Sequence, residues 1–162
     1  MSMKLNQFLA LFPKIDPPLT ITDESIFAFS KKNKLINLET ANRIMSELEA
    51  DYDEAEEREY IPCFQLHLSD EFYSLVYWRA SALSYEYYLV NLDKKGQLLD
   101  RRLVAGIVAE DDSVVRMYLS IDVNQIFYIA AQLSDDGQEL VDKNDTQTYS
   151  LEVLPDGSII TS

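Results

Sequence analysis

From Tyr60 onward, apolar and polar residues alternate with a period of two, and this pattern constrains the fold more than any other feature of the sequence. Successive side chains of a strand point to opposite faces, so alternation over several residues indicates a strand with one apolar and one mixed face. The cleanest run is 113–123, in which five apolar residues take every second position. Repeated runs of this kind are typical of an antiparallel sheet that is wet on one side.

The alternating runs predict about seven to eight strands joined by short turns. Three turns contain a glycine in a polar segment, at Gly96, Gly137 and Gly157, as hairpin corners with positive φ require. Because the connections are short, each strand should pair with its neighbour in the sequence. The expected strands are 60–68, 72–80, 84–93, 97–108, 113–122, 125–134 and 147–154, with a short one at 158–161.

The first 59 residues contain helical patterns instead. Residues 4–12 carry apolar side chains at i, i+3, i+4 and i+7, which predicts a short helix. A second helix is expected over 38–50, with Asn37 as its N-cap. The proline-containing segment 13–22 should be extended, because a residue before proline avoids the α region. Residues 23–29 fit either a helical turn or a short strand.

These patterns predict an α+β fold, in which an N-terminal helical segment packs on an antiparallel β-meander of about seven to eight strands. We expect residues 1–162 to form a single domain, with a helical or irregular part over 1–59 and the meander over 60–162. The helices need an apolar surface, and the apolar face of the sheet is the expected one. A small closed β-barrel is the alternative architecture.

The chain is strongly acidic, with a formal net charge of −14. The charge is concentrated in residues 47–162, which carry 24 acidic and 8 basic side chains. Nucleic-acid binding depends on neutralising phosphates with Lys and Arg, so this charge argues against nucleic acids and anionic membranes as partners. It favours a basic protein partner instead.

Cysteine content and hydropathy are consistent with a soluble, cytoplasmic protein. Cys63 is the only cysteine, so an intrachain disulfide cannot form, and a reducing compartment agrees with this. No stretch approaches the roughly 18 apolar residues of a membrane span. The apolar run from Phe8 to Phe12 is too short for the core of a signal peptide.

No catalytic, metal-binding or nucleotide-binding motif stands out, so we expect a non-catalytic protein without a cofactor. Cys63 and His67 lie on one predicted strand face, about 13 Å apart at ~3.3 Å per residue, which is too far for a catalytic pair. Both are expected to be outward-facing. One Cys and one His cannot form a structural zinc site, and the acidic segment lacks the central glycine of an EF-hand loop.

Aromatic residues in the predicted hairpin 72–93 form the first candidate site. Alternation places rings on both faces of this hairpin, so some of the rings are expected at the surface. Cross-strand pairing explains such rings without a function, whereas Tyr and Trp also concentrate at interfaces. The candidate ligand or partner patch consists of Tyr73, Tyr77, Trp78, Tyr85, Tyr87 and Tyr88.

The second candidate is the acidic segment from Glu47 to Glu59, in which eight of thirteen residues are acidic. We interpret it as a solvated helix end that continues into a loop. As an interaction surface, it would consist of Asp51, Asp53, Glu54, Glu56 and Glu57.

Two classes of function remain. The charge favours a non-catalytic acidic protein that binds a basic protein, for instance as an inhibitor. The alternative is a small-ligand binder or an enzyme that uses the aromatic hairpin and nearby carboxylates. A deep pocket lined by the rings would favour the second class, whereas a flat acidic face would favour the first.

Overall fold

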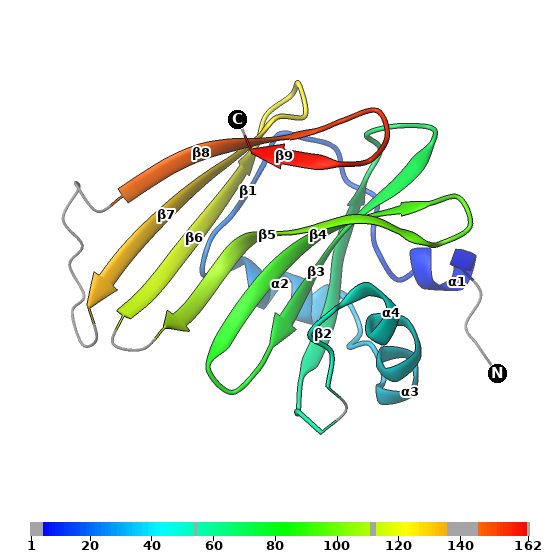
Figure 1. The fold of residues 1–162 in the computed structure, drawn as a ribbon, viewed down its shortest axis with the longest axis horizontal. Helices are drawn as coiled ribbons and strands as arrows, with labels where there is room; N and C mark the ends of the chain where they lie inside the picture. Colours follow the sequence, from blue (N-terminus) through cyan, green and yellow to red (C-terminus); the bar gives the residue numbers. More distant parts are fainter. Residues whose placement is uncertain (1–4, 54, 111–112, 136–145, 162) are drawn as a thin grey trace.

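The computed structural model describes residues 5–53, 55–110, 113–135 and 146–161. In these ranges the chain has an α+β fold with nine antiparallel strands in one sheet (Figure 1). The strands are β1 (Leu19–Ile21), β2 (Glu59–Leu66), β3 (Phe72–Ala80), β4 (Ser84–Asp93), β5 (Leu98–Glu110), β6 (Ser113–Ile121), β7 (Phe127–Asp135), β8 (Thr146–Val153) and β9 (Ile159–Thr161).

Strands β2 to β9 form a meander in which each strand pairs with the next. The predicted α+β meander is therefore confirmed. The sheet is open, with β2 and β9 at the two ends of this order, so the alternative of a closed barrel is not adopted. Glycines form two of the expected hairpin corners, since Gly96 and Gly157 have φ of 89° and 90°. The third expected corner, Gly137, lies outside the described residues.

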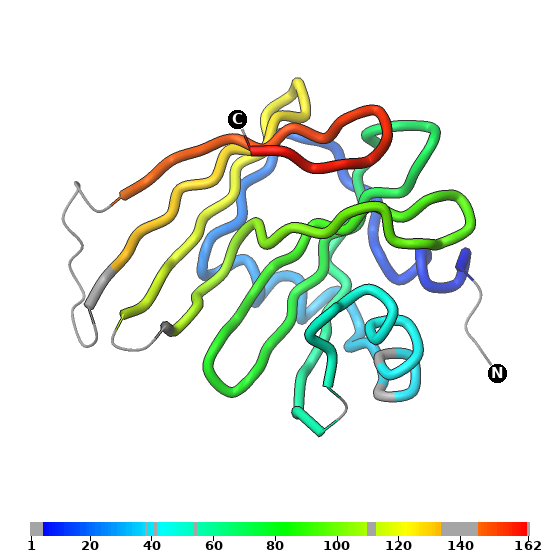
Figure 2. Tube along the Cα trace, viewed as in Figure 1, coloured from blue at the N-terminus to red at the C-terminus, as the bar shows by residue number. Residues whose placement is uncertain are grey.

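Strand β1 comes from the N-terminal part that was expected only to be extended. Strand β5 pairs with β6 as far as Met117, and β1 then takes the same edge of β6 from Leu119 to Ile121. Figure 2 shows the N-terminal segment running from α1 to this position beside β6. Residues 19–21 are thereby joined to the middle of the meander.

The helices are short and lie on two sides of the sheet. They are α1 (Leu5–Leu9), α2 (Ser25–Lys32), α3 (Leu38–Thr40), the π-helical stretch η1 (Ala41–Met45) and α4 (Ser46–Leu48). The last three are continuous, and we call them the 38–48 helical segment. Asn37 caps it as predicted, because its side-chain oxygen accepts a hydrogen bond from the Thr40 N–H at 2.8 Å. No helix in the described ranges is long and apolar enough to cross a membrane.

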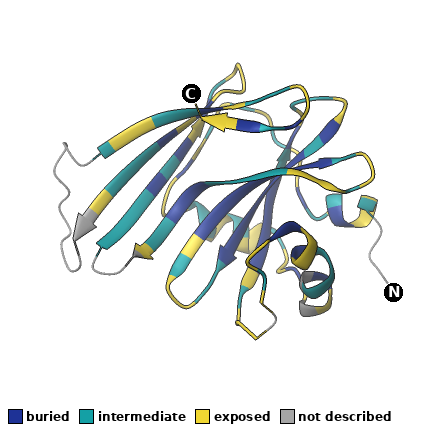
Figure 3. Cartoon of the chain, in the orientation of Figure 1, coloured by how far each residue is buried: buried dark blue, intermediate teal, exposed yellow. Residues whose placement is uncertain are grey.

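Strands β2, β3 and β4 are buried on both faces (Figure 3). The expectation of a sheet that is wet on one side is therefore wrong for these strands. It holds better at β6, where every second residue from Met117 to Ile121 is buried and the residues between them are not. The difference arises because helices cover both sides of β2–β4, with α2 behind the sheet and the 38–48 helical segment in front of it (Figure 1).

One face of the sheet, which we call the inner face, carries a single apolar cluster. Strands from both ends of the strand order contribute to it. Trp78 and Leu89 of β3 and β4 belong to the same cluster as Leu119 and Phe127 of β6 and β7. Helix α2 packs against this cluster through two of its apolar side chains. Because the sheet curves, inner-face side chains of different strands contact one another, and they make up most of this apolar cluster.

The outer face of β2–β4 forms a second apolar cluster with the remaining helices. Phe8 of α1 and Met45 of the 38–48 helical segment pack there with Tyr77 and Val90 of the sheet. The two expected helices, 4–12 and 38–50, were expected on the apolar face of the sheet. The corresponding α1 and 38–48 helical segment pack on the outer face, whereas α2 packs on the inner face.

A β-bulge in β2 overturns the prediction for Cys63. The register between β2 and β3 shifts between Pro62 and Phe64, and Cys63 and Phe64 are both in the inner-face cluster. Cys63 is only 1% exposed, and this burial raises the pKa of its thiol. His67 is exposed, as expected, and lies just beyond the end of β2.

The burial along β6 leads to a stability test. Leu119 is fully buried in the inner-face cluster, whereas the adjacent Ser120 is exposed. Leu119→Ala should lower the free energy of unfolding by about 2–5 kcal/mol, because it leaves a cavity. Ser120→Ala should change it by less than about 0.5 kcal/mol. Urea denaturation of both variants checks this, and equal losses would contradict the register.

Candidate functional site

The aromatic hairpin is divided between the two faces of the sheet. Strand register places Tyr77 opposite Tyr88 and Trp78 opposite Tyr87, and neighbouring pairs point to opposite faces. Trp78 and Tyr87 belong to the inner-face cluster, and Tyr77 and Tyr88 to the outer-face cluster. The predicted patch is therefore not one surface, and each half has its own surroundings.

On the inner face, a cavity of about 450 Å³ opens between α2 and the sheet, and its wall is mainly apolar. Three of the six predicted aromatic residues line it. The lining consists of Thr22, Asp23, Ile26, Phe27, Ser30, Glu59, Ile61, Trp78, Tyr85, Tyr87, Gly106, Ile107 and Met117. We call this space the α2 cavity.

Aromatic rings line the α2 cavity from its depth to its mouth. The Trp78 ring is stacked on that of Tyr85, with a centroid distance of 5.8 Å and an interplanar angle of 9°. Trp78 is buried, whereas Tyr85 is 52% exposed and Phe27 of α2 is 64% exposed. These two exposed side chains line one cavity instead of lying singly on the surface, so the mouth is a candidate contact surface.

The strand register arranges the wall of the cavity in two rows. Glu59, Ala80 and Tyr85 lie side by side across β2, β3 and β4, and the next row inward is Ile61, Trp78 and Tyr87. Such rows place a carboxylate at one side of the mouth and an aromatic ring at the other. Only the small side chain of an alanine lies between them.

Gly106 allows β5 to lie close beside β4 at this wall. It has a φ of 133°, and a Cβ atom there would lie 2.1 Å from the carbonyl oxygen of Tyr85. Any other residue would push the two strands apart, because this distance is far below a normal contact. The backbone of Gly106 itself therefore forms part of the cavity lining.

Tyr87 carries a polar group that the protein leaves unsatisfied. The side chain is buried, and its hydroxyl has no hydrogen-bond partner among the described residues. Burial raises the pKa of this hydroxyl, and the nearby Cys63 and Asp23 raise it further. Tyr87 therefore remains protonated, and its O–H is enclosed by protein atoms.

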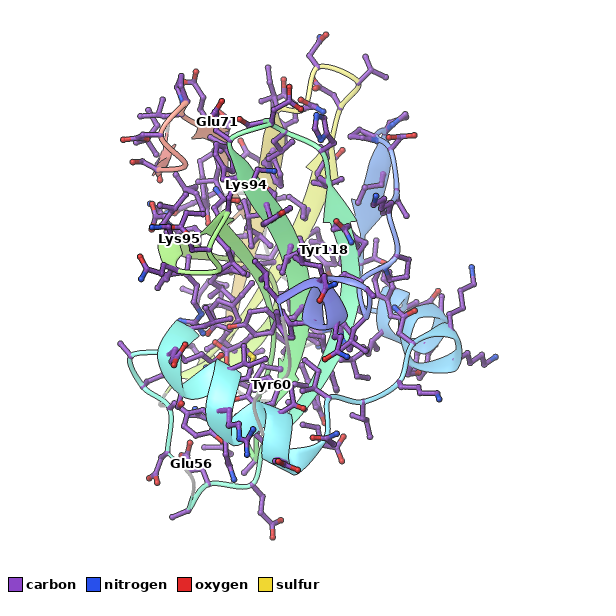
Figure 4. The ribbon with its side chains drawn as sticks, turned by 90° about the vertical axis from the view of Figure 1, so that its right-hand side faces the viewer. Glu56, Tyr60, Glu71, Lys94, Lys95 and Tyr118 are labelled. Carbon is purple, nitrogen blue, oxygen red and sulfur yellow. The ribbon has the colours of Figure 1, made fainter. Side chains whose placement is uncertain are left out.

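On the outer face, Tyr77 and Tyr88 of the hairpin belong to a network around the buried carboxylate of Glu49. This residue is 2% exposed and lies just after the 38–48 helical segment. Its carboxylate accepts hydrogen bonds from the Tyr60 hydroxyl at 2.7 Å, the Tyr77 hydroxyl at 2.6 Å and the Arg101 guanidinium at 2.9 Å. Figure 4 shows Tyr60 beside this helical segment.

Arg79 extends this network across the hairpin. One of its guanidinium nitrogens lies 3.3 Å from the Glu49 carboxylate, and the other donates to Glu86 at 2.9 Å and to the Tyr88 hydroxyl at 3.0 Å. Burial opposes the charge of Arg79, but the hydrogen bond to Glu86 and the Glu49 charge outweigh it and raise the pKa of the guanidinium. We call these residues, together with Arg101 and the three tyrosines, the Glu49 network.

The acidic segment is mostly exposed to solvent, as expected, and it also supplies carboxylates that pair with arginines. Asp51 accepts hydrogen bonds from Arg79 at 3.2 Å, and Glu56 pairs with Arg58. Burial tends to raise the pKa of Asp51, but the neighbouring Arg79 overrides this and lowers it. Asp51, Asp53, Glu56 and Glu57 are all exposed.

Tyr73 lies apart from both arrangements. It is at the far end of the hairpin, where the Lys94 ammonium is 4.2 Å from its ring centroid. Glu54 lies outside the described residues. The structure therefore brings together Trp78, Tyr85 and Tyr87 in the cavity, and a separate set in the Glu49 network.

Sequence reasoning missed the arginines of the network and the contribution of α2 to the cavity. One signal was present, because the predicted hairpin places Arg79 directly opposite Glu86 in otherwise apolar strands. No comparable signal existed for Phe27, since residues 23–29 fitted more than one local structure. Comparison of the chain with protein-family models, curated proteins and solved structures finds no match.

The Glu49 network predicts a large effect of a single substitution. Glu49→Gln should lower the free energy of unfolding by about 3–5 kcal/mol, because it leaves Arg101 without its buried counter-ion and removes one of the carboxylates paired with Arg79. Glu47→Gln is the matched control, since Glu47 is exposed on the same helical segment. Its effect should stay below about 0.5 kcal/mol in urea denaturation. Similar values for the two variants would contradict the network.

Two Tyr→Phe substitutions should have opposite effects. Tyr87→Phe removes a buried hydroxyl without a partner and should raise the free energy of unfolding by about 1 kcal/mol. Tyr60→Phe removes a hydrogen bond to a buried carboxylate and should lower it by about 1.5–3 kcal/mol. Thermal and urea unfolding measure both, and destabilisation by Tyr87→Phe would show that its hydroxyl has a partner.

Proposed function

We propose that the protein is a non-catalytic binding protein that holds a small, mainly apolar ligand in the α2 cavity. The single observation that carries this proposal is the cavity itself, with a volume of about 450 Å³ and a mainly apolar wall. Ligand pockets are typically about 300–1,000 Å³, apolar, and furnished with a few polar groups that orient the ligand. The α2 cavity has each of these properties.

The lining residues divide into contact surfaces and orienting groups. Trp78, Tyr85 and Phe27 present ring surfaces that suit an apolar ligand. Thr22 and Ser30 also line the cavity, and their hydroxyls are the neutral polar groups that can orient a ligand.

The Glu49 network supports the proposal by making the cavity wall rigid. It fastens β2, β3 and β4 from the outer face at Tyr60, Arg79 and Glu86. The same strands carry cavity residues on their inner face, so the wall is held in place before a ligand arrives. A preformed site loses less conformational entropy on binding.

The chemistry of the lining favours binding over catalysis. It includes carboxylates and hydroxyls, but no histidine, cysteine or lysine is among the described residues that line it. The Ser30 hydroxyl donates to the Phe27 carbonyl at 3.2 Å, so it has no neighbouring base to activate it.

Binding of a basic protein through the acidic segment stays a prediction. The net charge of −14 supports it, but Asp51 and Glu56 already pair with arginines. Asp53 and Glu57 would be the exposed carboxylates of such a surface for which no ion pair is found among the described residues. A cytoplasmic location and the absence of nucleic-acid binding also stay predictions.

A filled cavity should abolish binding of a neutral apolar probe. We expect N-phenylnaphthylamine to bind the parent protein with increased probe fluorescence, and to quench the emission of Trp78, the only tryptophan. Ser30→Phe places a ring in the cavity and should weaken binding at least about tenfold, which corresponds to ~1.4 kcal/mol.

The matched control is Thr148→Phe, because Thr148 is exposed on β8 and is not part of the cavity lining. This variant should bind the probe as the parent protein does. Near-UV circular dichroism establishes that both variants are folded. Equal probe affinity of folded Ser30→Phe and the parent would refute the proposed site.

A further inference from the structure

Glu59 is a carboxylate at the α2 cavity that the protein does not neutralise. It lines the cavity at the start of β2. Among the residues that the structure describes, no Lys or Arg forms an ion pair with it. The other carboxylate of the lining, Asp23, is paired with Arg116 at 3.1 Å. The titratable groups near the mouth therefore leave one negative charge without a partner.

Aromatic rings lie close to this charge. Tyr85 is separated from Glu59 by Ala80 alone in the strand register, so their Cα atoms are about 10 Å apart at the usual strand spacing. Tyr85 and Phe27 are both largely exposed. The faces of aromatic rings attract cations, and rings combined with a carboxylate are a common arrangement for binding quaternary ammonium groups.

We propose that the ligand of the α2 cavity is a small amphiphile with a cationic ammonium group. The ammonium lies at the mouth, between the Glu59 carboxylate and the rings of Tyr85 and Phe27, and the apolar part lies beneath α2 beside Trp78. This inference rests on the proposed function and adds the chemical class of the ligand. The net charge of −14 acts in the same direction, because it attracts cations and repels anions.

The charge of α2 does not oppose this assignment. Its basic residues, Lys31 and Lys32, lie in the last turn of the helix and are not part of the cavity lining. The cationic side chain closest to the lining is Arg116, and its charge is balanced by Asp23. A ligand with an anionic head would meet Glu59 without a compensating free cation among the lining residues.

Three probes with the same octyl chain test the charge of the head group. Octyltrimethylammonium, octanol and octyl sulfate are titrated below their micelle concentrations, with Trp78 emission and displacement of N-phenylnaphthylamine as readouts. The ammonium should bind about tenfold tighter than the alcohol, and the sulfate should bind weakest. The preference should decrease at high salt, because the mouth is exposed to solvent.

Glu59→Gln should reduce the preference for the ammonium over the alcohol to about threefold or less, with octanol affinity unchanged. Glu57→Gln is the matched control, since Glu57 is exposed nearby and does not line the cavity; it should keep the full preference. Equal affinities for the three probes, or tighter binding of the sulfate, would overturn the cationic assignment while leaving the proposed function intact. If no octyl probe and no N-phenylnaphthylamine binds, the proposed function fails and the assignment fails with it.

Discussion

The burial of the Glu49 carboxylate is the constraint on which the rest of this structure depends. A carboxylate that is removed from water requires compensating donors and cations, and two tyrosines and three arginines supply them here. Four of these partners come from β2, β3 and β5, and the fifth, Arg58, directly precedes β2. The single side chain of Glu49 therefore ties the end of the 38–48 helical segment to three strands at once, and the outer-face apolar cluster packs around this connection.

The network also determines the character of the opposite face. In a strand, each residue committed to one face places its neighbours on the other. Arg79 belongs to the network, so Trp78 faces the inner side. Glu86 belongs to the network, so Tyr85 and Tyr87 face the inner side. The rigid ionic layer and the aromatic wall of the α2 cavity are therefore two consequences of one strand register. We infer that the stability of the outer face supports the binding site on the inner face.

Prediction from the sequence was accurate for the sheet and only partial for the site. The strands and their order follow from the period of two and from turns such as Gly96 and Gly157. Three aromatic residues of the predicted patch do line a cavity. The arginine partners of the acidic segment were missed, because composition describes how many charges the segment carries and not what faces them. Asp51 is paired with Arg79, which lies 28 residues away in the sequence. Cys63 was misplaced because one bulge in β2 reverses the alternation.

Local sequence patterns alone account for strands β2 to β9, the hairpins and the α+β class of this protein. Side-chain alternation and turn glycines act over a few residues, so their effect can be recognised in the sequence. Three features follow only from the tertiary structure. They are the burial of Glu49, the covering of both faces of β2–β4 and the cavity beneath α2. The contacts responsible join residues far apart, such as Glu49 and Arg101, which are separated by 52 positions. Such pairings depend on how the sheet curves and where the helices dock, and no local pattern encodes either.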